Sequence, residues 1–273
     1  MAAPLCYFAV IVSPPFWRTK LKLIKPGLMA LALLAAFGTS ARTIEEIKKG
    51  GTMLVATEGQ FAPFNFFVGN QLTGFEIELT ELVAKKMGVK LEWKALSFDA
   101  LLAGLRQGRW DIAVASHGIT DERAKAVTFA EPHYCSGGMI VAKDPAIRTI
   151  KDLAGKTVSV QTGTSYLDNV KNVPGLKEAK NFPSDTDARS ALVAGRADAW
   201  VSDRFVAIEA LRKNPGLGLK MGELLFVERI AAAVTKGNTG LAAAWNKALS
   251  EVIADGSYAT LSKRYFEEDI RCK

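Results

Sequence analysis

The segment from residue 116 to residue 134, SHGITDERAKAVTFAEPHY, holds the side chains with the clearest potential chemistry in this chain. Thr120 can cap a helix whose first turn carries Asp121 and Glu122, the charges that a helix dipole favours at that end. Arg123 brings the opposite charge into the same turn. One interpretation is a surface arginine that extends into water. The other is an arginine directed into a crevice, where its guanidinium grips a ligand carboxylate through two hydrogen bonds.

A carboxylate ligand held in this way needs further partners, and candidates follow the ends of predicted strands. Asp203 can hold an ammonium group, and Thr164 and Ser165 lie in a glycine-containing turn whose amides and hydroxyls suit an anion. Phe61 and Phe98 can enclose an apolar or cationic side chain. Each position also has a purely structural explanation, as a helix cap, a turn former or a core aromatic. From the residues alone, both interpretations stay open.

Motifs for other chemistry are missing. The chain has no Gly-x-Ser-x-Gly elbow, no His-Glu-x-x-His helix and no Cys-x-x-Cys pair. Gly155-Lys156-Thr157 lacks the first glycine of a phosphate-binding loop, because residue 150 is Ile150. Only two histidines are present, His117 and His133, which makes a multi-histidine metal centre improbable. The sequence therefore predicts no catalytic residues, no metal and no cofactor.

Strands alternate with helices along the first half. Apolar runs predict strands at Thr52–Thr57, Leu91–Trp93 and Ile112–Ala115. The apolar spacing over Gly74–Met87 predicts a helix, and Ser97 can cap another that ends at Gly108. This alternation is typical of a parallel α/β sheet.

The alternation starts again in the second half. Predicted strands cover Val158–Val160, Ala197–Ser202 and an apolar stretch near Ile230–Val234; predicted helices cover Ala188–Ala194, Phe205–Lys213 and Gly240–Phe266, the last broken at Asp255-Gly256. A Gly-Arg-x-Asp turn links a helix to a strand in each half. Counting eight residues on from its glycine reaches Ser116 in one half and Asp203 in the other. Strand ends from the two halves can then face one crevice, the place where open α/β sheets bind ligands.

The N-terminal segment has the order of a secretory signal. Basic residues at 18–25 precede the ten-residue apolar run Leu28–Phe37, and small residues follow it. Ten residues fall short of the roughly 20 needed to span a bilayer. We expect residues 1–41 to be removed after Ala41, the alternative being an uncleaved anchor. Export to an oxidising compartment would allow Cys135 and Cys272 to pair, although nothing in the sequence shows that they do.

The net charge does not favour nucleic acid as a partner. The whole chain carries +7, but removing the four basic residues of segment 1–41 leaves 31 basic against 28 acidic ones, a net charge of +3.

Over residues 43–268 the chain resembles bacterial extracellular solute-binding proteins that serve polar amino-acid ABC importers. The shared motifs are ATE at 56–58 through FAPF at 61–64, GFEIEL at 74–79, FDALL at 98–102, ITDER at 119–123, AGRADA at 194–199 and DGSY at 255–258. The resemblance implies a two-lobed α/β periplasmic-binding-protein fold (type II) with two crossings between the lobes. Lobe 1 would comprise residues 42–138 plus 231–273, and lobe 2 residues 139–230.

The resemblance also implies roles for individual residues. Arg123 would take the α-carboxylate of an amino acid, with Ser165 and the Thr164 region completing that grip from lobe 2. Asp203 and Ser116 would take the α-ammonium.

The side-chain pocket follows from the same resemblance. Phe61 and Phe98 would line it, and Glu58 stands where many relatives that bind polar or cationic amino acids have an acid. Three positions depart from the family pattern: Gly118 replaces a common Ser or Thr, His117 an apolar residue, and His133 a tyrosine. These departures leave the identity of the ligand open.

The function implied by the resemblance is that of a monomeric periplasmic protein that closes on a polar amino acid and delivers it to an ABC permease, with Glu58 indicating a cationic one. Two alternatives remain at this stage. The fold also serves as a sensor module for a separate partner, and a few relatives are enzymes acting on small carboxylates.

Overall fold

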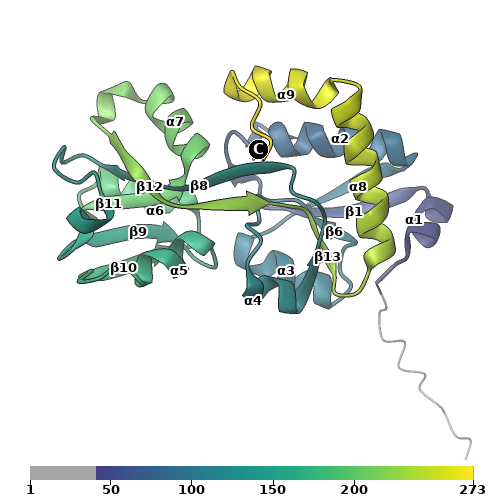
Figure 1. Cartoon of the computed structure of the whole chain (residues 1–273), viewed down its shortest axis with the longest axis horizontal. Helices are drawn as coiled ribbons and strands as arrows, with labels where there is room; N and C mark the ends of the chain where they lie inside the picture. The colour runs from purple at the N-terminus through teal and green to yellow at the C-terminus, as the bar shows by residue number, and fades with distance from the viewer. Residues whose placement is uncertain (1–40, 273) are drawn as a thin grey trace, which may run out of the picture. The chain divides into compact units, whose positions relative to one another are not determined.

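The computed structural model describes residues 41–272, which form two five-stranded sheets, a small three-stranded sheet and the helices that cover them (Figure 1). The predicted signal peptide therefore lies outside the described residues, apart from Ala41. Within the described range, no helix combines the length and the apolar character needed to cross a bilayer.

The first sheet has the order β5-β1-β6-β13-β7. Its strands are β1 (Thr52–Thr57), β5 (Lys90–Ala95), β6 (Ile112–Ala113), β7 (Val127–Phe129) and β13 (Ala233–Thr235). Alternate residues of β1 face opposite sides, as a pleated strand requires. Met53 and Val55 join one buried cluster, while Ala56 joins another that also contains Leu101 and Leu105 of helix α3 (Phe98–Arg106). We call this sheet and its helices the first lobe.

Helices cover the first sheet and extend beyond it. Besides α3 they are α1 (Ile44–Gly50), α2 (Phe75–Met87), α4 (Asp121–Ala126), α8 (Thr239–Ala254) and α9 (Ser257–Phe266). Helices α8 and α9 come from the end of the chain, yet both pack against α2. The C-terminal residues therefore complete the core of the lobe in which the described chain begins. A hairpin sheet, β2 (Gln60–Phe61), β3 (Asn65–Val68) and β4 (Gln71–Thr73), precedes α2.

The second sheet has the order β10-β9-β11-β8-β12. Its strands are β8 (Tyr134–Ala142), β9 (Thr157–Gln161), β10 (Glu178–Phe182), β11 (Ala199–Asp203) and β12 (Lys220–Ile230). Helices α5 (Ser165–Lys171), α6 (Asp185–Val193) and α7 (Arg204–Lys213) pack on it, and two short 3-10 helices, Ile150–Leu153 and Pro215–Leu217, lie in its connections. We call this sheet and its helices the second lobe.

Two long antiparallel strands connect the lobes. Strand β8 starts at Tyr134, shortly after β7 of the first sheet, and β12 ends at Ile230, shortly before β13. Tyr134 pairs directly with Ile230, and Figure 1 shows both strands running from one group of elements to the other. Each strand is therefore a continuous hydrogen-bonded crossing between the lobes.

The predicted helices and strand positions are largely confirmed, and the expected parallel pairing is present in both sheets, although each sheet also contains a reversed strand. Strands β1, β5 and β6 are parallel, as are β9, β10 and β11. Strands β13 and β8 run antiparallel to their neighbours. The reason is the crossing: a chain that leaves one lobe by an extended strand and returns by another adds a reversed strand to each sheet.

The two expected crossings are present, but the residues that form them were not identified as strands from the sequence. The stretch predicted as one strand, 230–234, is the end of β12 and the start of β13. Strand β8 contains Gly137 and Gly138, which interrupt the alternation that reveals a strand in sequence. Both glycines make room for β12: a Cβ at Gly137 would lie 2.1 Å from the carbonyl oxygen of Phe226, and one at Gly138 would lie 2.6 Å from its ring.

Candidate functional site

Arg123 lies where the two lobes meet. The predicted helix cap is present, since the Thr120 hydroxyl accepts a hydrogen bond from the Arg123 amide in the first turn of α4. The guanidinium donates to the carbonyl oxygen of Gly118 at 2.8 Å and to that of Gly163 at 3.0 Å. Gly118 belongs to the first lobe and Gly163 to the second. Arg123 therefore contacts both lobes and does not simply extend into water.

A stack of three side chains supports this arginine. The Arg123 guanidinium carbon lies 5.6 Å from the centre of the Phe98 ring, and the His117 ring stacks on Phe98 at 4.6 Å. His117 is fully buried, and burial together with the nearby arginine lowers its pKa well below the usual range. A neutral imidazole therefore backs Phe98, which explains a histidine at a position where an apolar residue would serve.

The turn in the second lobe has its hydroxyl groups engaged. Gly163 has a φ of 75°, in the left-handed region that glycine adopts without strain. Thr164 caps α5: its hydroxyl accepts from the Leu167 amide and donates to the carbonyl oxygen of Gln161 at 2.7 Å. The Ser165 hydroxyl donates to a side-chain carboxylate, that of Glu228, at 2.6 Å.

Ser116 is held by a buried carboxylate that the sequence analysis did not identify. Glu76, on α2, is fully buried and accepts from the Ser116 amide at 2.9 Å and from its hydroxyl at 3.0 Å. Asn65 donates to the same carboxylate at 2.9 Å, and His133 Nε2 lies 2.9 Å from its other oxygen. Ser116 has a φ of 55°, uncommon for a residue with a side chain, and this network fixes it there.

Asp203 is fully buried at the end of β11 and also caps a helix. Its Oδ1 accepts from the Phe205 amide at 2.7 Å and more weakly from the Val206 amide of α7. Its other oxygen, Oδ2, has no hydrogen bond of good geometry within residues 41–272. Burial raises the pKa of Asp203 to about 7, although Ser136 and the two amides oppose that shift. Oδ1 of Asp203 therefore caps the helix, while Oδ2 of the same carboxyl group is the candidate ligand-binding atom.

A small cavity of about 10 Å³ lies between the lobes, room for roughly one water molecule. Its lining comes from both lobes: Glu58, Phe61, Phe98, Ser116, Gln161, Thr164, Ser165 and Tyr166. Six of the nine predicted ligand-binding residues line it. The other three lie nearby, since Arg123 bonds to Gly118 and to the Gly163 turn, and Asp203 contributes with Glu228 to the raised pKa of Tyr166.

Glu58 is the acid of the cavity on the side of the first lobe. The Gln161 side-chain amide donates to its Oε1 at 2.5 Å, across the two lobes. Burial raises the pKa of Glu58 to about 8; the Gln161 hydrogen bond opposes the shift, and the nearby Asp185 and Asp99 add to it. An unpaired carboxylate in this position is unfavourable, so a cation placed here would be stabilised.

Four side chains of the site were missed by sequence reasoning: Glu76, Gln161, Tyr166 and Glu228. Gln161 stands at the end of a predicted strand, two residues before Gly163, so the strand-end rule could have found it. Glu228 lies on β12, which was not predicted, and Glu76 carried no signal beyond its place in a helix.

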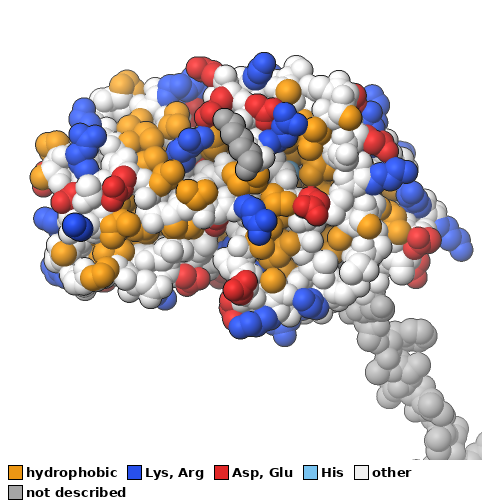
Figure 2. Space-filling model, in the orientation of Figure 1, with side chains coloured by type: hydrophobic (Ala, Val, Ile, Leu, Met, Phe, Trp, Pro, Cys, Tyr) orange, Lys and Arg blue, Asp and Glu red, His pale blue; other side chains and the backbone are white. Residues whose placement is uncertain are grey.

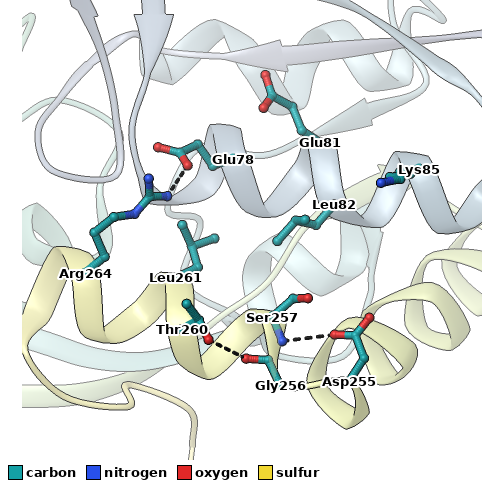
Figure 3. A pocket seen from close by; sticks show the side chains of 10 residues that line it. All are labelled: Glu78, Glu81, Leu82, Lys85, Asp255, Gly256, Ser257, Thr260, Leu261 and Arg264. Carbon is teal, nitrogen blue, oxygen red and sulfur yellow. Dashed lines mark hydrogen bonds and ion pairs between the residues drawn. The ribbon is translucent and has the colours of Figure 1, made fainter.

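A larger groove of about 540 Å³ lies on the surface of the first lobe, between α2 and α9 (Figure 3). Glu78 and Arg264 form an ion pair beside it, and Leu82 and Leu261 contribute apolar walls. None of the nine predicted ligand-binding residues, all of which lie in the described range, lines this groove.

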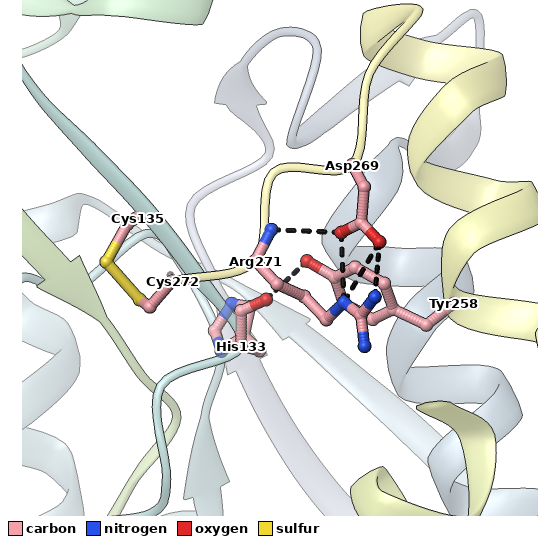
Figure 4. The surroundings of a disulfide bond; sticks show 6 residues. All are labelled: His133, Cys135, Tyr258, Asp269, Arg271 and Cys272. Atoms are coloured by element: carbon pink, nitrogen blue, oxygen red, sulfur yellow. Dashed lines mark hydrogen bonds and ion pairs between the residues drawn. A yellow bond between two sulfur atoms is a disulfide. The ribbon is translucent and has the colours of Figure 1, made fainter. Parts of the chain in front are cut away.

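Cys135 and Cys272 form a disulfide, which settles the pairing that the sequence left open (Figure 4). Cys135 is on the crossing strand β8, and its amide donates to the carbonyl oxygen of Ile270 at 3.0 Å. Arg204, on α7 of the second lobe, binds Glu268 at 3.0 Å. The C-terminal segment is thus attached both to a crossing strand and to the second lobe. Among residues 41–272, no cluster of three or more His, Cys, Asp or Glu side chains is placed to hold a metal ion.

Two α/β lobes joined by two strands, with charged and aromatic side chains facing each other across the seam, define a two-lobed binding protein. The sequence profile of bacterial extracellular solute-binding proteins, family 3, matches residues 53–268, and the chain belongs to that family. The L-cystine-binding protein TcyJ of Escherichia coli (strain K12) is 34% identical over 253 residues, which cover 89% of this chain and 95% of that protein.

Solved structures show the same fold. An ancestral arginine-binding protein bound to arginine is 39% identical with a TM-score of 0.76, covering 79% of this chain and 98% of that one. The ancestral amino-acid-binding protein AncCDT-1, described as a precursor of cyclohexadienyl dehydratase, is 33% identical with a TM-score of 0.75, covering 82% and 99%. The expected two-lobed periplasmic-binding-protein fold is confirmed, and these relatives are named as binding proteins.

Proposed function

We propose that this protein captures a polar amino acid between its two lobes and delivers it to the permease of an ABC importer. The observation that carries this proposal is the position of Arg123, which donates hydrogen bonds to one carbonyl oxygen in each lobe. A guanidinium is the side chain best suited to bind a carboxylate through two hydrogen bonds. We assign residues 42–138 and 231–273 to the first lobe and 139–230 to the second, a boundary that falls within the crossing strand β8.

In this proposal the two charged groups of the amino acid bind to opposite sides of the seam. Arg123 takes the α-carboxylate, with the Ser165 hydroxyl and the Thr164 turn beside it. Asp203 Oδ2 and Ser116 take the α-ammonium. Support comes from Asp203 itself: one oxygen caps α7, while the other is buried without a well-formed hydrogen bond in the described structure, so an ammonium would satisfy it.

The side chain of the amino acid would enter the space between Phe61 and Phe98 and end at Glu58. A lysine-, arginine-, histidine- or ornithine-like cation would compensate the buried carboxyl of Glu58. A neutral amide such as that of glutamine would bond to Glu58 and Gln161 without neutralising any charge. The acid therefore favours a cationic ligand.

Capture requires the lobes to move apart and close again. The cavity of about 10 Å³ is too small for an amino acid, so the closed arrangement must open to admit one. On closure, each ligand charge exchanges water for a fixed partner of opposite charge in a low-dielectric cleft. We expect a roughly micromolar dissociation constant, which corresponds to a binding free energy of about −8 kcal/mol.

The same proposal covers location and partners. Residues 1–41 direct the chain to the periplasm and are removed, and the mature protein is a monomer that meets a membrane permease. We propose no catalytic turnover and no nucleic-acid partner. On the face seen in Figure 2, basic and acidic side chains are interspersed rather than gathered into a single basic patch.

A thermal-shift screen tests the binding function. The full chain is expressed with its own N-terminus in a Gram-negative host and purified from the periplasm, and mass spectrometry reports the site of cleavage. A true ligand at a hundredfold excess over its Kd stabilises the protein by about 2.7 kcal/mol. The proposal predicts that at least one polar amino acid gives such a shift and is recovered unchanged. No shift with any amino acid, or conversion of the bound one, would contradict it.

A further inference from the structure

Glu228 is a buried acid that none of the proposed ligand contacts includes. It lies near the end of the crossing strand β12 and is only 8% exposed. The segment around Gly118 runs alongside this strand: Gly118 forms a bridge with Ile230, and the Ile119 amide donates to the carbonyl oxygen of Arg229 at 2.8 Å. The pairing directs the Glu228 side chain toward the seam between the lobes.

The carboxylate of Glu228 lies among the groups proposed to bind the ligand carboxylate. Ser165 donates its hydroxyl to Glu228 Oε2 at 2.6 Å. The attraction of Arg123 and the Ser165 and Tyr166 hydroxyls favour the charged form of Glu228, but burial dominates and raises its pKa. A carboxyl group of the protein therefore already occupies the neighbourhood of Arg123 and Ser165.

Gly118 is the residue that makes room for this anion. A Cβ at position 118 would lie 2.0 Å from Glu228 Oε2 and 2.8 Å from its Cδ, far closer than atoms can approach. A serine or threonine at this position cannot coexist with the observed Glu228 side chain. The carboxylate of Glu228 thus occupies the space that a side chain at position 118 would need.

We propose that Glu228 is a specificity-determining residue: an internal carboxylate that competes with the carboxylate of the ligand for Arg123 and Ser165. This inference rests on the proposed amino-acid-binding function. A free amino acid must displace Glu228 from Ser165 or place its carboxylate beside that of Glu228 near Arg123, and like charges buried side by side repel strongly. A ligand whose carboxyl group is masked as an amide escapes this competition. The cleft therefore discriminates against free carboxylates more than its arginine alone would suggest.

Glu228→Gln tests the competition by titration calorimetry with two probes, L-arginine and L-argininamide. The substitution keeps the size of the side chain and an oxygen that can accept from Ser165, but it removes the charge. We expect L-arginine to bind about tenfold more tightly to the variant than to the wild type. L-argininamide carries no carboxylate. Its affinity for Glu228→Gln should be equal to or lower than its affinity for the wild type.

Glu223→Gln is the matched control, because Glu223 lies on the same strand but is exposed. It should leave both affinities unchanged. If Glu228 acts only through packing, its substitution changes both probes by the same factor, and the inference fails. It also fails if L-arginine binds neither protein, whereas the amino-acid panel decides the proposed function separately.

A second pair of variants keeps the inference testable if glutamine at 228 disturbs the fold. Glu228→Ala removes the carboxylate, and Gly118→Ser in that background adds a hydroxyl in the space released. L-arginine should bind more tightly to Glu228→Ala than to the wild type, and adding Gly118→Ser should tighten binding further. Weaker binding to Glu228→Ala at unchanged thermal stability would overturn the proposal.

Discussion

Arg123 Nη2 donates a hydrogen bond to the carbonyl oxygen of Gly163 at 3.0 Å, so a side chain of the first lobe is bound to the backbone of the second. The same guanidinium holds the carbonyl oxygen of Gly118 at 2.8 Å on its own lobe. One residue therefore links the lobes at the point where a ligand carboxylate is proposed to bind.

Arg123→Ala should reduce ligand affinity by roughly 2–5 kcal/mol, because the ligand carboxylate would be buried without its cationic partner. Titration calorimetry with the amino acid that gives the largest thermal shift measures the loss. Arg148→Ala, at an exposed position of the second lobe, is the control and should bind as the wild type does. Wild-type affinity in Arg123→Ala would remove this residue from the site.

Asp203→Asn should separate the capping role of this residue from its charge. Asparagine caps helices about as well as aspartate, so the contact with the Phe205 amide is retained. Removing the charge should weaken amino-acid binding by about 2 kcal/mol or more, because the ligand ammonium loses its anion. Calorimetry gives the affinity and thermal unfolding gives the stability.

Asp144→Asn provides the comparison for Asp203, since Asp144 is exposed and also accepts from a backbone amide. The affinity of Asp144→Asn for the amino acid should equal that of the wild type. A loss of stability in Asp203→Asn with unchanged affinity would assign Asp203 to the cap alone.

Glu58→Gln should be more stable than the wild type, by an amount that increases with pH. The folded-state pKa of Glu58 is about 8 against 4.5 in the unfolded chain. Between these values the unfolded chain loses the proton while the folded protein keeps it, so wild-type stability falls as the pH rises. The difference grows by at most about 1.4 kcal/mol per pH unit and levels off above pH 8. Urea unfolding of both proteins from pH 4 to pH 9 measures it, and parallel curves would show that Glu58 is not buried in solution.

The same carboxyl distinguishes a cationic from a neutral ligand. A cation bound at Glu58 lowers the pKa of this group, so arginine or lysine should release a proton on binding near pH 7. Glutamine should release none at this residue. Calorimetry in buffers with different ionisation enthalpies counts the protons, and Glu58→Gln should abolish the difference between the two ligands.

Replacing both Cys135 and Cys272 with serine should destabilise the protein by roughly 3–5 kcal/mol, because the bond joins residues 137 positions apart and restricts the unfolded chain. Thermal unfolding measures the effect. A reductant should lower the melting temperature of the wild type toward that of the variant and leave the variant unchanged. Identical melting temperatures would show that the bond adds no stability.

Local sequence patterns were enough to predict much of the secondary structure of this protein. Periodicity and capping residues predicted α2, α4 and the break between α8 and α9, because these depend on neighbours within a few positions. Several candidate site residues could be predicted from their positions after strand ends, because side chains that follow parallel strands collect at one edge of a sheet. That rule brought Ser116, Thr164 and Ser165 to the same cavity.

The tertiary structure decided the rest, because the missing features depend on residues that are distant in sequence. Two crossings were expected, but the residues that form them were not identified, since Gly137 and Gly138 of β8 are placed by their contacts with Phe226 of β12 and not by a local sequence pattern. The acid at Glu228 became visible only when β12 brought it to Ser165, and Glu76 only when α2 brought it to Ser116. The Cys135–Cys272 bond likewise required the C-terminus to return to the crossing strand. Sequence spacing reports which groups share one helix or strand, whereas long-range packing decides which buried charges meet.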